Sequence, residues 1–259
     1  MSPLINARGI GGSIINIGRY AKGYYALFGY SLKNLPVLKI SPVRSVLYKQ
    51  IYFTGVEALS KIALLGMLIG LVIITQITNL AGSNAVLTEK ILIWTVVREL
   101  GPLLAAIIII ARSGTAIASE LGAMKVNREL DHLRIMGIDP MDYLLVPRVL
   151  GITVSVFIIT LYFQLTAVAG GLALTSLIMD IPFLQHLKGI FLALSFFEVA
   201  VSLLKSLVFG LLIAVISCYQ GLSVRDSITE IPQAATKAVM QSLFLVFIFD
   251  GIITFIAFI

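Results

Sequence analysis

Charged residues are scarce in this sequence. Asp, Glu, Lys and Arg make up 12% of the 259 residues, against roughly 25% in an ordinary soluble domain. Hydrophobic residues make up 59%, and the mean hydropathy is +1.02. Apolar runs of about 18 or more residues, long enough to cross a hydrocarbon core of roughly 30 Å as helix, recur along the chain. The composition therefore predicts an all-α, polytopic integral membrane protein.

Cysteine is nearly absent, and the common catalytic motifs are absent. The single cysteine, Cys218, lies in an apolar run, cannot form an internal disulfide and is interpreted as a packing residue. The chain has no Gly-x-x-x-x-Gly-Lys-Ser/Thr phosphate loop, no His-Glu-x-x-His and no Cys-x-x-Cys. We therefore expect neither ATP hydrolysis nor a metal site in this chain. The N-terminus lacks an apolar stretch followed by a small-residue cleavage site, so no removed signal peptide is expected.

The basic residues gather before the first long apolar run. The net charge is +6, and eight cations in this segment are opposed only by Glu57: Arg8, Arg19, Lys22, Lys33, Lys39, Arg44, Lys49 and Lys61. This distribution fits a membrane better than nucleic acid, and the positive-inside rule makes residues 1–61 a cytoplasmic or interfacial segment. Residues 41–61 predict an amphipathic helix on the membrane surface, with a partly ordered basic tail as the alternative.

Residues 62–259 read as a transmembrane domain with five spans. Their expected limits are 62–80, 91–119, 149–179, 190–219 and 238–259. An odd number of spans places the C-terminus on the outer side. The cations of the two expected outer links are Lys90 and Lys188, which agrees with the charge bias. The third span contains Gly170 and Gly171, where we expect it to be tilted or broken.

Five ionisable residues lie inside these spans: Arg98, Glu99, Arg112, Lys205 and Asp250. Each costs roughly 2.5 to 3.5 kcal/mol at mid-helix on insertion scales, so each should face protein or water. Glu198 is two helical turns from Lys205 and cannot pair with it along the helix. Glu99 is the candidate partner of Lys205, because the second and fourth spans run in the same direction. Alternatively, these charges only hold helices in register.

Small residues recur at four-residue spacing in two places, where they make smooth faces for close packing of helices or protomers. These residues are Gly66 and Gly70 in the first span, and Gly114, Ala118 and Gly122 at the end of the second.

The segment from Met124 to Gly137 predicts a short amphipathic helix between the second and third spans. Its apolar residues fall at helical spacing: Val126, Leu130, Leu133 and Met136. Charged residues on its other faces include Arg128, Asp131 and Arg134. Gly137 and Pro140 should end it. Such a helix suits docking into a groove on a cytoplasmic partner protein, and a helix lying flat on the bilayer is the alternative.

Several of these segments resemble a known family. The run Val97-Arg98-Glu99-Leu100-Gly101-Pro102 and its continuations at 111–124, 133–140 and 146–148 closely resemble the signature block of MlaE/YrbE permeases. Weaker similarity extends through 204–209 and 234–239 to Asp250 and covers most of the chain after Gln50.

The resemblance implies a homodimeric permease of an ABC-type lipid transporter that moves phospholipid or a related lipid. Two copies of a cytoplasmic ABC ATPase would bind ATP and Mg, an MCE-domain protein would sit on the outer face, and this chain would carry no cofactor and no catalytic residue. The membrane would be a bacterial inner membrane or a plastid inner envelope, with the N-terminus in the cytoplasm. Residues 124–137 would be the coupling helix. Glu99 and Lys205, with Leu100 beside them, would form the lipid pocket.

Two other classes fit part of the pattern. An ion-coupled transporter or channel would use Glu99 and Asp250 as a cation or proton relay, but it has no need of a cytoplasmic docking helix. A passive membrane anchor would explain the small-residue faces but not the buried charges.

Overall fold

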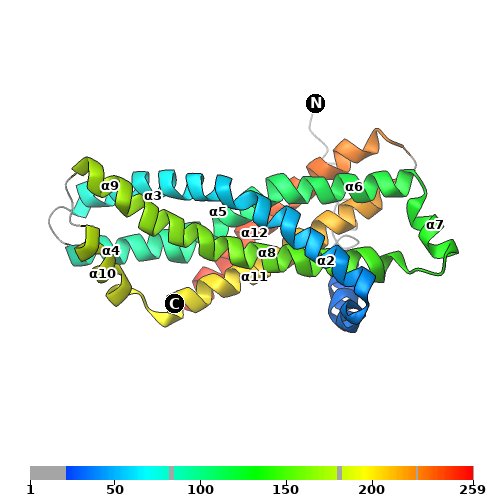
Figure 1. Ribbon diagram of the computed structural model, residues 1–259, viewed down its shortest axis with the longest axis horizontal. Coiled ribbons are helices and arrows are strands. Elements are labelled where there is room, and N and C mark those ends of the chain that lie inside the picture. The colour runs from blue at the N-terminus through cyan, green and yellow to red at the C-terminus, as the bar shows by residue number, and fades with distance from the viewer. Residues whose placement is uncertain (1–21, 82–84, 180–182, 226, 259) are drawn as a thin grey trace, which may run out of the picture.

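The structure is a computed structural model, and it describes residues 22–81, 85–179, 183–225 and 227–258. The described residues contain no strand and form an elongated helical bundle (Figure 1). Five helical stretches are long and apolar enough to cross a membrane: Ser41–Leu80, Glu89–Val126, Met141–Leu177, Phe196–Ser223 and Glu230–Phe258. The prediction of an all-α polytopic protein with five spans is therefore confirmed.

The first span is longer than predicted and bends near its start. It consists of α2 (Ser41–Thr54), the 3-10 turn η2 (Val56–Ala58) and α3 (Leu59–Ala81). We expected residues 41–61 to form a separate surface helix, whereas α2 packs along α8 (Val146–Leu165) and leads into α3. Gly151 of α8 permits this contact, because a Cβ there would lie 2.7 Å from Gln50 Cγ. Residues 22–33 form a further helix that lies beside α2 at the edge of the bundle, roughly perpendicular to its long axis (Figure 1).

The second span is one continuous helical rod with two π-helical segments. Its parts are α4 (Ala85–Leu92), η3 (Ile93–Leu100), α5 (Gly101–Ile109), η4 (Ile110–Gly114) and α6 (Thr115–Val126), of which η3 and η4 are π-helical. The predicted end at residue 119 was wrong. The helix continues to Val126 because Leu121 and Gly122 remain buried against other helices.

The third span passes both predicted glycines without breaking. Its parts are the π-helical η5 (Met141–Leu145), α8, the π-helical η6 (Thr166–Gly170) and α9 (Gly171–Met179). Its backbone touches that of the first span. A Cβ on Gly70 would lie 2.0 Å from Ala167 O, and one on Gly171 would lie 2.6 Å from the Gly70 carbonyl carbon. The Gly66 and Gly70 pair therefore packs two helices of the same chain.

The fourth and fifth spans are α11 (Phe196–Ser223) and α12 (Glu230–Phe258). The predicted fourth span began at 190, but residues Phe183–Ala193 form a separate helix, α10. Ser195 starts α11, because its side chain accepts a bond from Phe197 N while Glu198 accepts from Ser195 N. Helix α12 begins eight residues before the predicted start at 238. Pro232 is tolerated there because first-turn N–H groups have no intrahelical acceptor.

The stripe of Gly114, Ala118 and Gly122 also packs within the chain, against α11 and the segment after it. Cβ atoms built on Gly114 and Gly122 would lie 3.1 Å from Ser217 Oγ and from Val224 Cγ2, and one on Gly221 would lie 2.8 Å from Ala118 O. The stripe therefore packs helices of the same chain.

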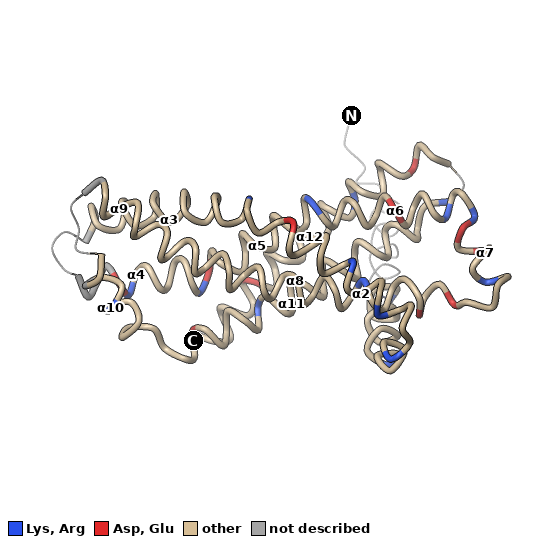
Figure 2. The backbone as a smooth tube through the Cα atoms, viewed as in Figure 1, with Lys and Arg blue, Asp and Glu red and all other residues tan. Residues whose placement is uncertain are grey.

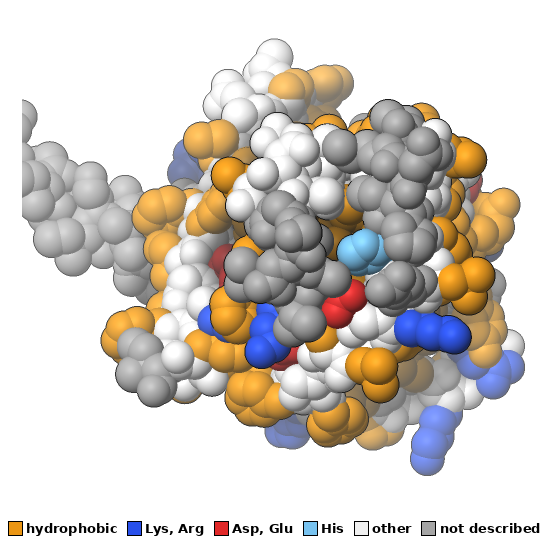
Figure 3. All heavy atoms as spheres, turned by 90° about the vertical axis from the view of Figure 1, so that its left-hand side faces the viewer, with side chains coloured by type: hydrophobic (Ala, Val, Ile, Leu, Met, Phe, Trp, Pro, Cys, Tyr) orange, Lys and Arg blue, Asp and Glu red, His pale blue; other side chains and the backbone are white. Residues whose placement is uncertain are grey.

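The spans differ sharply in burial. In its most apolar window the third span is 72% buried, whereas the fifth is 11% buried. Figure 3 views the molecule from the end where α4 and α10 lie, and hydrophobic side chains surround its circumference. The fifth span therefore presents most of its apolar surface outward.

Candidate functional site

The site begins with two backbone carbonyls that the helix itself leaves free. In η3 the Gly101 N–H bonds to Val96 O, five residues back, and not to Val97 O. The next residue, Pro102, has no N–H to give to Arg98 O four residues before it. The π-helical turn and the proline together release the carbonyls of Val97 and Arg98. Such turns are frequent at functional sites.

Side chains from two other spans occupy these carbonyls. Gln164 of α8 donates through Nε2 to Val97 O at 2.9 Å and to Ser202 Oγ at 2.6 Å. Lys205 of α11 lies with Nζ 3.4 Å from Arg98 O. Side chains of the third and fourth spans thus contact the free backbone carbonyls of the second span.

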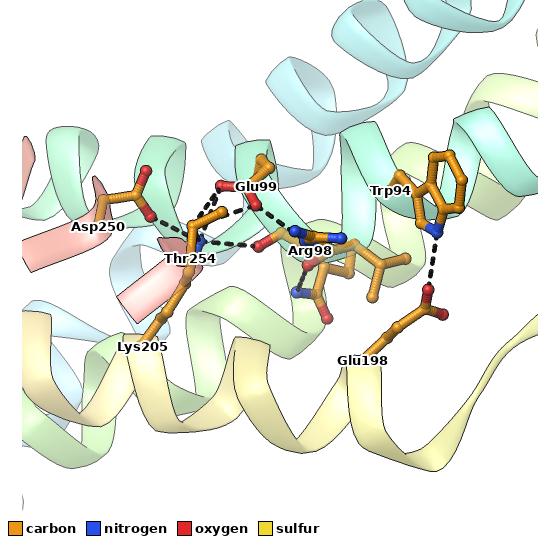
Figure 4. A network of polar contacts seen from close by, with 9 residues as sticks. Trp94, Arg98, Glu99, Glu198, Lys205, Asp250 and Thr254 are labelled. Atoms are coloured by element: carbon orange, nitrogen blue, oxygen red, sulfur yellow. Dashed lines mark hydrogen bonds and ion pairs between the residues drawn. The ribbon is translucent and has the colours of Figure 1, made fainter. Parts of the chain in front are cut away.

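Lys205 is the centre of a polar network in the bundle (Figure 4). Its side chain is fully buried, and Nζ lies 2.7 Å from Glu99 Oε2, 2.8 Å from Asp250 Oδ1 and 2.7 Å from Thr254 Oγ1. The predicted pairing of Lys205 with Glu99 is therefore present. Thr254 is a residue that sequence reasoning missed. Its position in the sequence could have indicated it, because it lies one helical turn after Asp250 and therefore on the same helix face.

Arg98 adds a second cation beside this network. Its Nε lies 3.1 Å from Glu99 Oε1, and its guanidinium lies over the ring of Phe258. Phe258 in turn makes an edge-to-face contact with Phe197, at 5.7 Å between ring centroids. We call the set formed by Arg98, Glu99, Lys205, Asp250 and Thr254 the Lys205 cluster. Its two cations and two carboxylates balance in formal charge.

Trp94 extends the contact between the second and fourth spans. Its Nε1 donates to Glu198 Oε1 at 2.9 Å, and Glu198 is the residue that helps cap the start of α11 (Figure 4). The fourth span therefore contacts the second span at two places: at the Lys205 cluster, and at Trp94, which lies one helical turn before Arg98.

The Lys205 cluster is not sealed. The side chain of Glu99 is 33% exposed, and that of Asp250 is 16% exposed, while Leu100 is half-buried. An open apolar groove lies on the same helix as Asp250 and Thr254. We call it the α12 groove, and its lining residues are Phe247, Ile248, Gly251, Ile252, Phe255 and Ile256. Helix α12 therefore carries residues of the polar cluster as well as an apolar groove.

Arg112 is not part of the cluster. Its Nη2 lies 2.6 Å from Oε2 of Glu57, at the bend between α2 and α3. A second isolated pair joins Arg148 of α8 to Glu120 of α6, also at 2.6 Å. Of the five ionisable residues predicted inside the spans, the structure brings four together and leaves Arg112 apart.

The segment predicted as one coupling helix from 124 to 137 is interrupted. Helix α6 ends at Val126 and includes Met124, and the shorter α7 spans Glu129–Ile135. Arg128 breaks the helix, because its backbone is left-handed at φ 59°. The predicted stop at Gly137 is correct: its φ is 77°, a conformation that glycine adopts without strain.

Helix α7 turns part of its apolar surface inward. Leu130 is 7% exposed, and Leu133 packs on the core, so these two face their own chain. The outward apolar surface consists of Ile135, Met136 and Ile138. Asp131 and Arg134 form an exposed pair at 3.2 Å. Helix α7 lies at one end of the bundle (Figure 1), where this surface is accessible.

The family model for the permease MlaE matches residues 47–256. The chain belongs to the MlaE permease family. It is therefore a membrane permease of the ABC-transporter type, which implies a separate ATPase partner.

Named relatives of this MlaE family member come from bacteria and a plant. A probable ABC transporter permease protein of Rickettsia typhi is 30% identical over 236 residues, which cover 90% of each chain. One from Synechocystis is 36% identical over 161 residues, or 62% of this chain and 61% of the relative. The chloroplastic protein TRIGALACTOSYLDIACYLGLYCEROL 1 of Arabidopsis thaliana is 33% identical over 157 residues, or 61% of this chain and 45% of the relative.

Proposed function

We propose that this chain is the permease subunit of a lipid transporter that moves phospholipid, or a related lipid, between the inner membrane and an MCE-domain partner. The observation that carries the proposal is that the Lys205 cluster and the α12 groove share the helix α12. A phospholipid has a charged head and apolar chains, and these two surfaces match that division. The name of the Arabidopsis relative refers to a diacylglycerol lipid, which supports the same substrate class.

The arrangement suggests how the head would be held. Nζ of Lys205 is already surrounded by acceptors, so a lipid phosphate would bind by displacing a carboxylate from it. Glu99 is the carboxylate best placed to leave, because a third of its side chain is exposed. Leu100 and the α12 groove would then contact the acyl chains. Closure of the partner ATPase would reverse the exchange and release the lipid.

Charge supports an orientation for the chain. Most Lys and Arg residues lie in the half of the bundle that carries α2, α6 and α7, and fewer lie toward α4 and α10 (Figure 2). By the positive-inside rule, the α7 end is cytoplasmic. Ile135, Met136 and Ile138 would then insert into the partner ATPase, which binds ATP and Mg, while this chain needs no cofactor. The membrane would be the bacterial inner membrane, with the plastid inner envelope as the second location.

A homodimer completes the proposal. Two copies of the ATPase require two docking helices and hence two copies of this chain. Large apolar side chains exposed on α3 and α12, outside the α12 groove, offer a surface for a second copy: Leu64, Leu68, Val72, Met240 and Phe244.

The test is to purify the tagged chain from its native membrane in mild detergent and to identify the copurifying protein and lipid by mass spectrometry. We expect a stoichiometric ATPase with a phosphate-loop motif, together with phospholipid. Lys205→Met should lower the recovered phospholipid about tenfold, which corresponds to ~1.4 kcal/mol, without loss of the ATPase. Lys61→Met, an exposed lysine on α3, is the control. Recovery of the chain alone and lipid-free, with ion flux that depends on Glu99, would favour the ion-coupled alternative.

A further inference from the structure

The helix of residues 22–33 precedes the segment that matches the family, which starts at residue 47. It packs against two distant parts of the bundle. One is the pair α11 and α12, and the other is the segment that follows α7. Leu27, between the two ends, is 6% exposed and belongs to the core.

The first end is anchored through Tyr24. Its hydroxyl donates to Gln241 Oε1 of α12 and accepts from Gln220 Nε2 of α11 at 3.2 Å. Its ring lies edge-to-face on Tyr219, with 4.9 Å between centroids. Gly23 permits this approach, because a Cβ there would lie 2.2 Å from the Tyr219 ring. Gln220 is only 1% exposed, so the contact is part of the interior.

The second end is anchored through Tyr30 and Asn34. The Tyr30 hydroxyl donates to Asp142 Oδ1 at 2.8 Å and lies 3.2 Å from Asp139 Oδ2. Asn34 Nδ2 donates to the same Asp142 oxygen at 2.8 Å. Partial burial and the carboxylates of Asp142 and Asp139 raise the pKa of Tyr30 to about 12, so its hydroxyl stays a donor at physiological pH. Asp139 lies four residues after the end of α7, and Asp142 lies in η5.

The two anchored ends are joined by a short, stiff segment. Tyr24 and Tyr30 are six residues apart, which is about 9 Å along a helix at 1.5 Å per residue. Gln241, the partner of Tyr24 on α12, lies nine residues before Asp250, which is about 14 Å along the helix. Gln220 is fifteen residues from Lys205 along α11, about 22 Å. A displacement of the α7 segment can therefore reach α11 and α12, two of the three helical elements that contribute to the Lys205 cluster.

We infer that helix 22–33 is a positioning element that transmits movement of the α7 and η5 segment to α11 and α12. The inference rests on the proposed function, in which α7 docks on the ATPase and the Lys205 cluster holds the lipid head. Tyr30, Asn34 and Asp142 position the segment and touch neither lipid nor nucleotide. Without their hydrogen bonds, ATP is still hydrolysed but less lipid moves for each ATP.

The experiment compares ATP turnover and lipid transfer in the complete complex, reconstituted with its partner ATPase in phospholipid vesicles. Tyr30→Phe combined with Asn34→Leu removes the hydrogen bonds to Asp142 and keeps the side-chain volumes. We expect lipid moved per ATP to fall about tenfold, because hydrogen bonds to charged groups are the stronger ones. ATP turnover per complex should stay within about twofold. Tyr25→Phe is the matched control, because Tyr25 lies on the same helix and is 77% exposed.

Rescue separates positioning from simple destabilisation. Tyr30→Phe combined with Asn34→Lys places a cation against Asp142 and should restore the lipid moved per ATP. If the Phe/Leu variant fails to assemble, Asp142→Asn keeps the side-chain volume and removes the charge of the acceptor, which weakens both hydrogen bonds. Proportional loss of ATP turnover and transfer, or an unchanged yield per ATP, overturns the inference while wild-type transfer still supports the proposed function. A wild-type complex that moves no lipid overturns both.

Discussion

Two kinds of ion pair stabilise this bundle, and they differ in how many helices share one cation. Lys205 is fully buried and serves acceptors on the second and fifth spans at once. Arg148 is also buried, with its side chain 5% exposed, but its carboxylate partner is the largely exposed Glu120 alone. A one-to-one pair holds two helices together. A shared cation can exchange one partner for a ligand and keep the others, which is what a binding site requires.

The largest predicted effect is the difference in lipid transfer between the same substitution at Lys205 and at Arg148. Lys205→Met should reduce lipid transfer per assembled complex by about a hundredfold or more, because it leaves Asp250 without its cation and Glu99 with Arg98 alone. Arg148→Met should lower the melting temperature but leave transfer per assembled complex within about threefold, because one ion pair between two helices is lost. Transfer by reconstituted complexes, normalised to folded protein, measures both. Equal loss in the two variants would mean that the cluster is only structural.

The carboxylates should behave as a coupled set. Glu99→Gln or Asp250→Asn alone should reduce transfer about tenfold, since Lys205 keeps one charged partner in each case. The double variant should fall by less than the product of the two, because both carboxylates share one cation and act as one network. A double-mutant cycle on transfer rates measures the coupling. Strict additivity would show that each carboxylate acts independently.

A third prediction concerns stability and the contact between the first and third spans. Gly70→Ala places a methyl group 2.0 Å from Ala167 O, so the helices must separate. We expect the free energy of unfolding to fall by about 1 to 3 kcal/mol, as for other overpacked interiors. Gly29→Ala is the control, because a Cβ there has no atom within 4 Å. Thermal unfolding of the purified chain in detergent compares the two, and equal melting temperatures would contradict the packing.

The charged residues of the site could be predicted from the sequence, because they lie inside apolar runs. Glu99, Lys205 and Asp250 stand out because ionised groups are costly in lipid and must find partners. Thr254 did not stand out, because a threonine hydroxyl can bond to its own helix backbone and then needs no partner elsewhere. The pairing of Arg112 with Glu57 was missed for another reason. Glu57 lies before the first predicted span, and hydropathy does not reveal the bend that brings it close.

Helix limits were predicted less well than helix number. Ser195 and Glu198 form a readable capping box, but the apolar residues before them continue the hydrophobic run, and the predicted span therefore started too early. Helical periodicity also continues through Asn127 and Arg128, where the backbone leaves the helix. The π-helical segment η3 had one local signal, Pro102, whose missing N–H frees a carbonyl. Hydropathy indicates which residues avoid water. It carries no information on where the backbone starts or leaves a helix, or where it becomes π-helical.

The smallest expected effect tests how finely the Lys205 cluster is tuned. Thr254 Oγ1 accepts from Lys205 Nζ at 2.7 Å and lies 3.2 Å from both oxygens of Glu99, so it joins the cation to the carboxylate. Thr254→Val keeps the side-chain shape and removes an uncharged hydroxyl while both carboxylates remain beside Lys205, and a single hydrogen bond contributes about 1 kcal/mol. Lipid transfer should therefore fall about fivefold.

The matched control for this change lies on the same helix. Thr236→Val removes a hydroxyl that bonds only within α12, to Pro232 O at 2.9 Å, so transfer should stay unchanged. If both variants transfer lipid like the wild type, Lys205 is held by the two carboxylates without help from the hydroxyl. If only Thr254→Val is impaired, the neutral member of the cluster contributes to its geometry. A half-buried threonine one turn from a carboxylate within a span would then indicate such a cluster in other permease sequences.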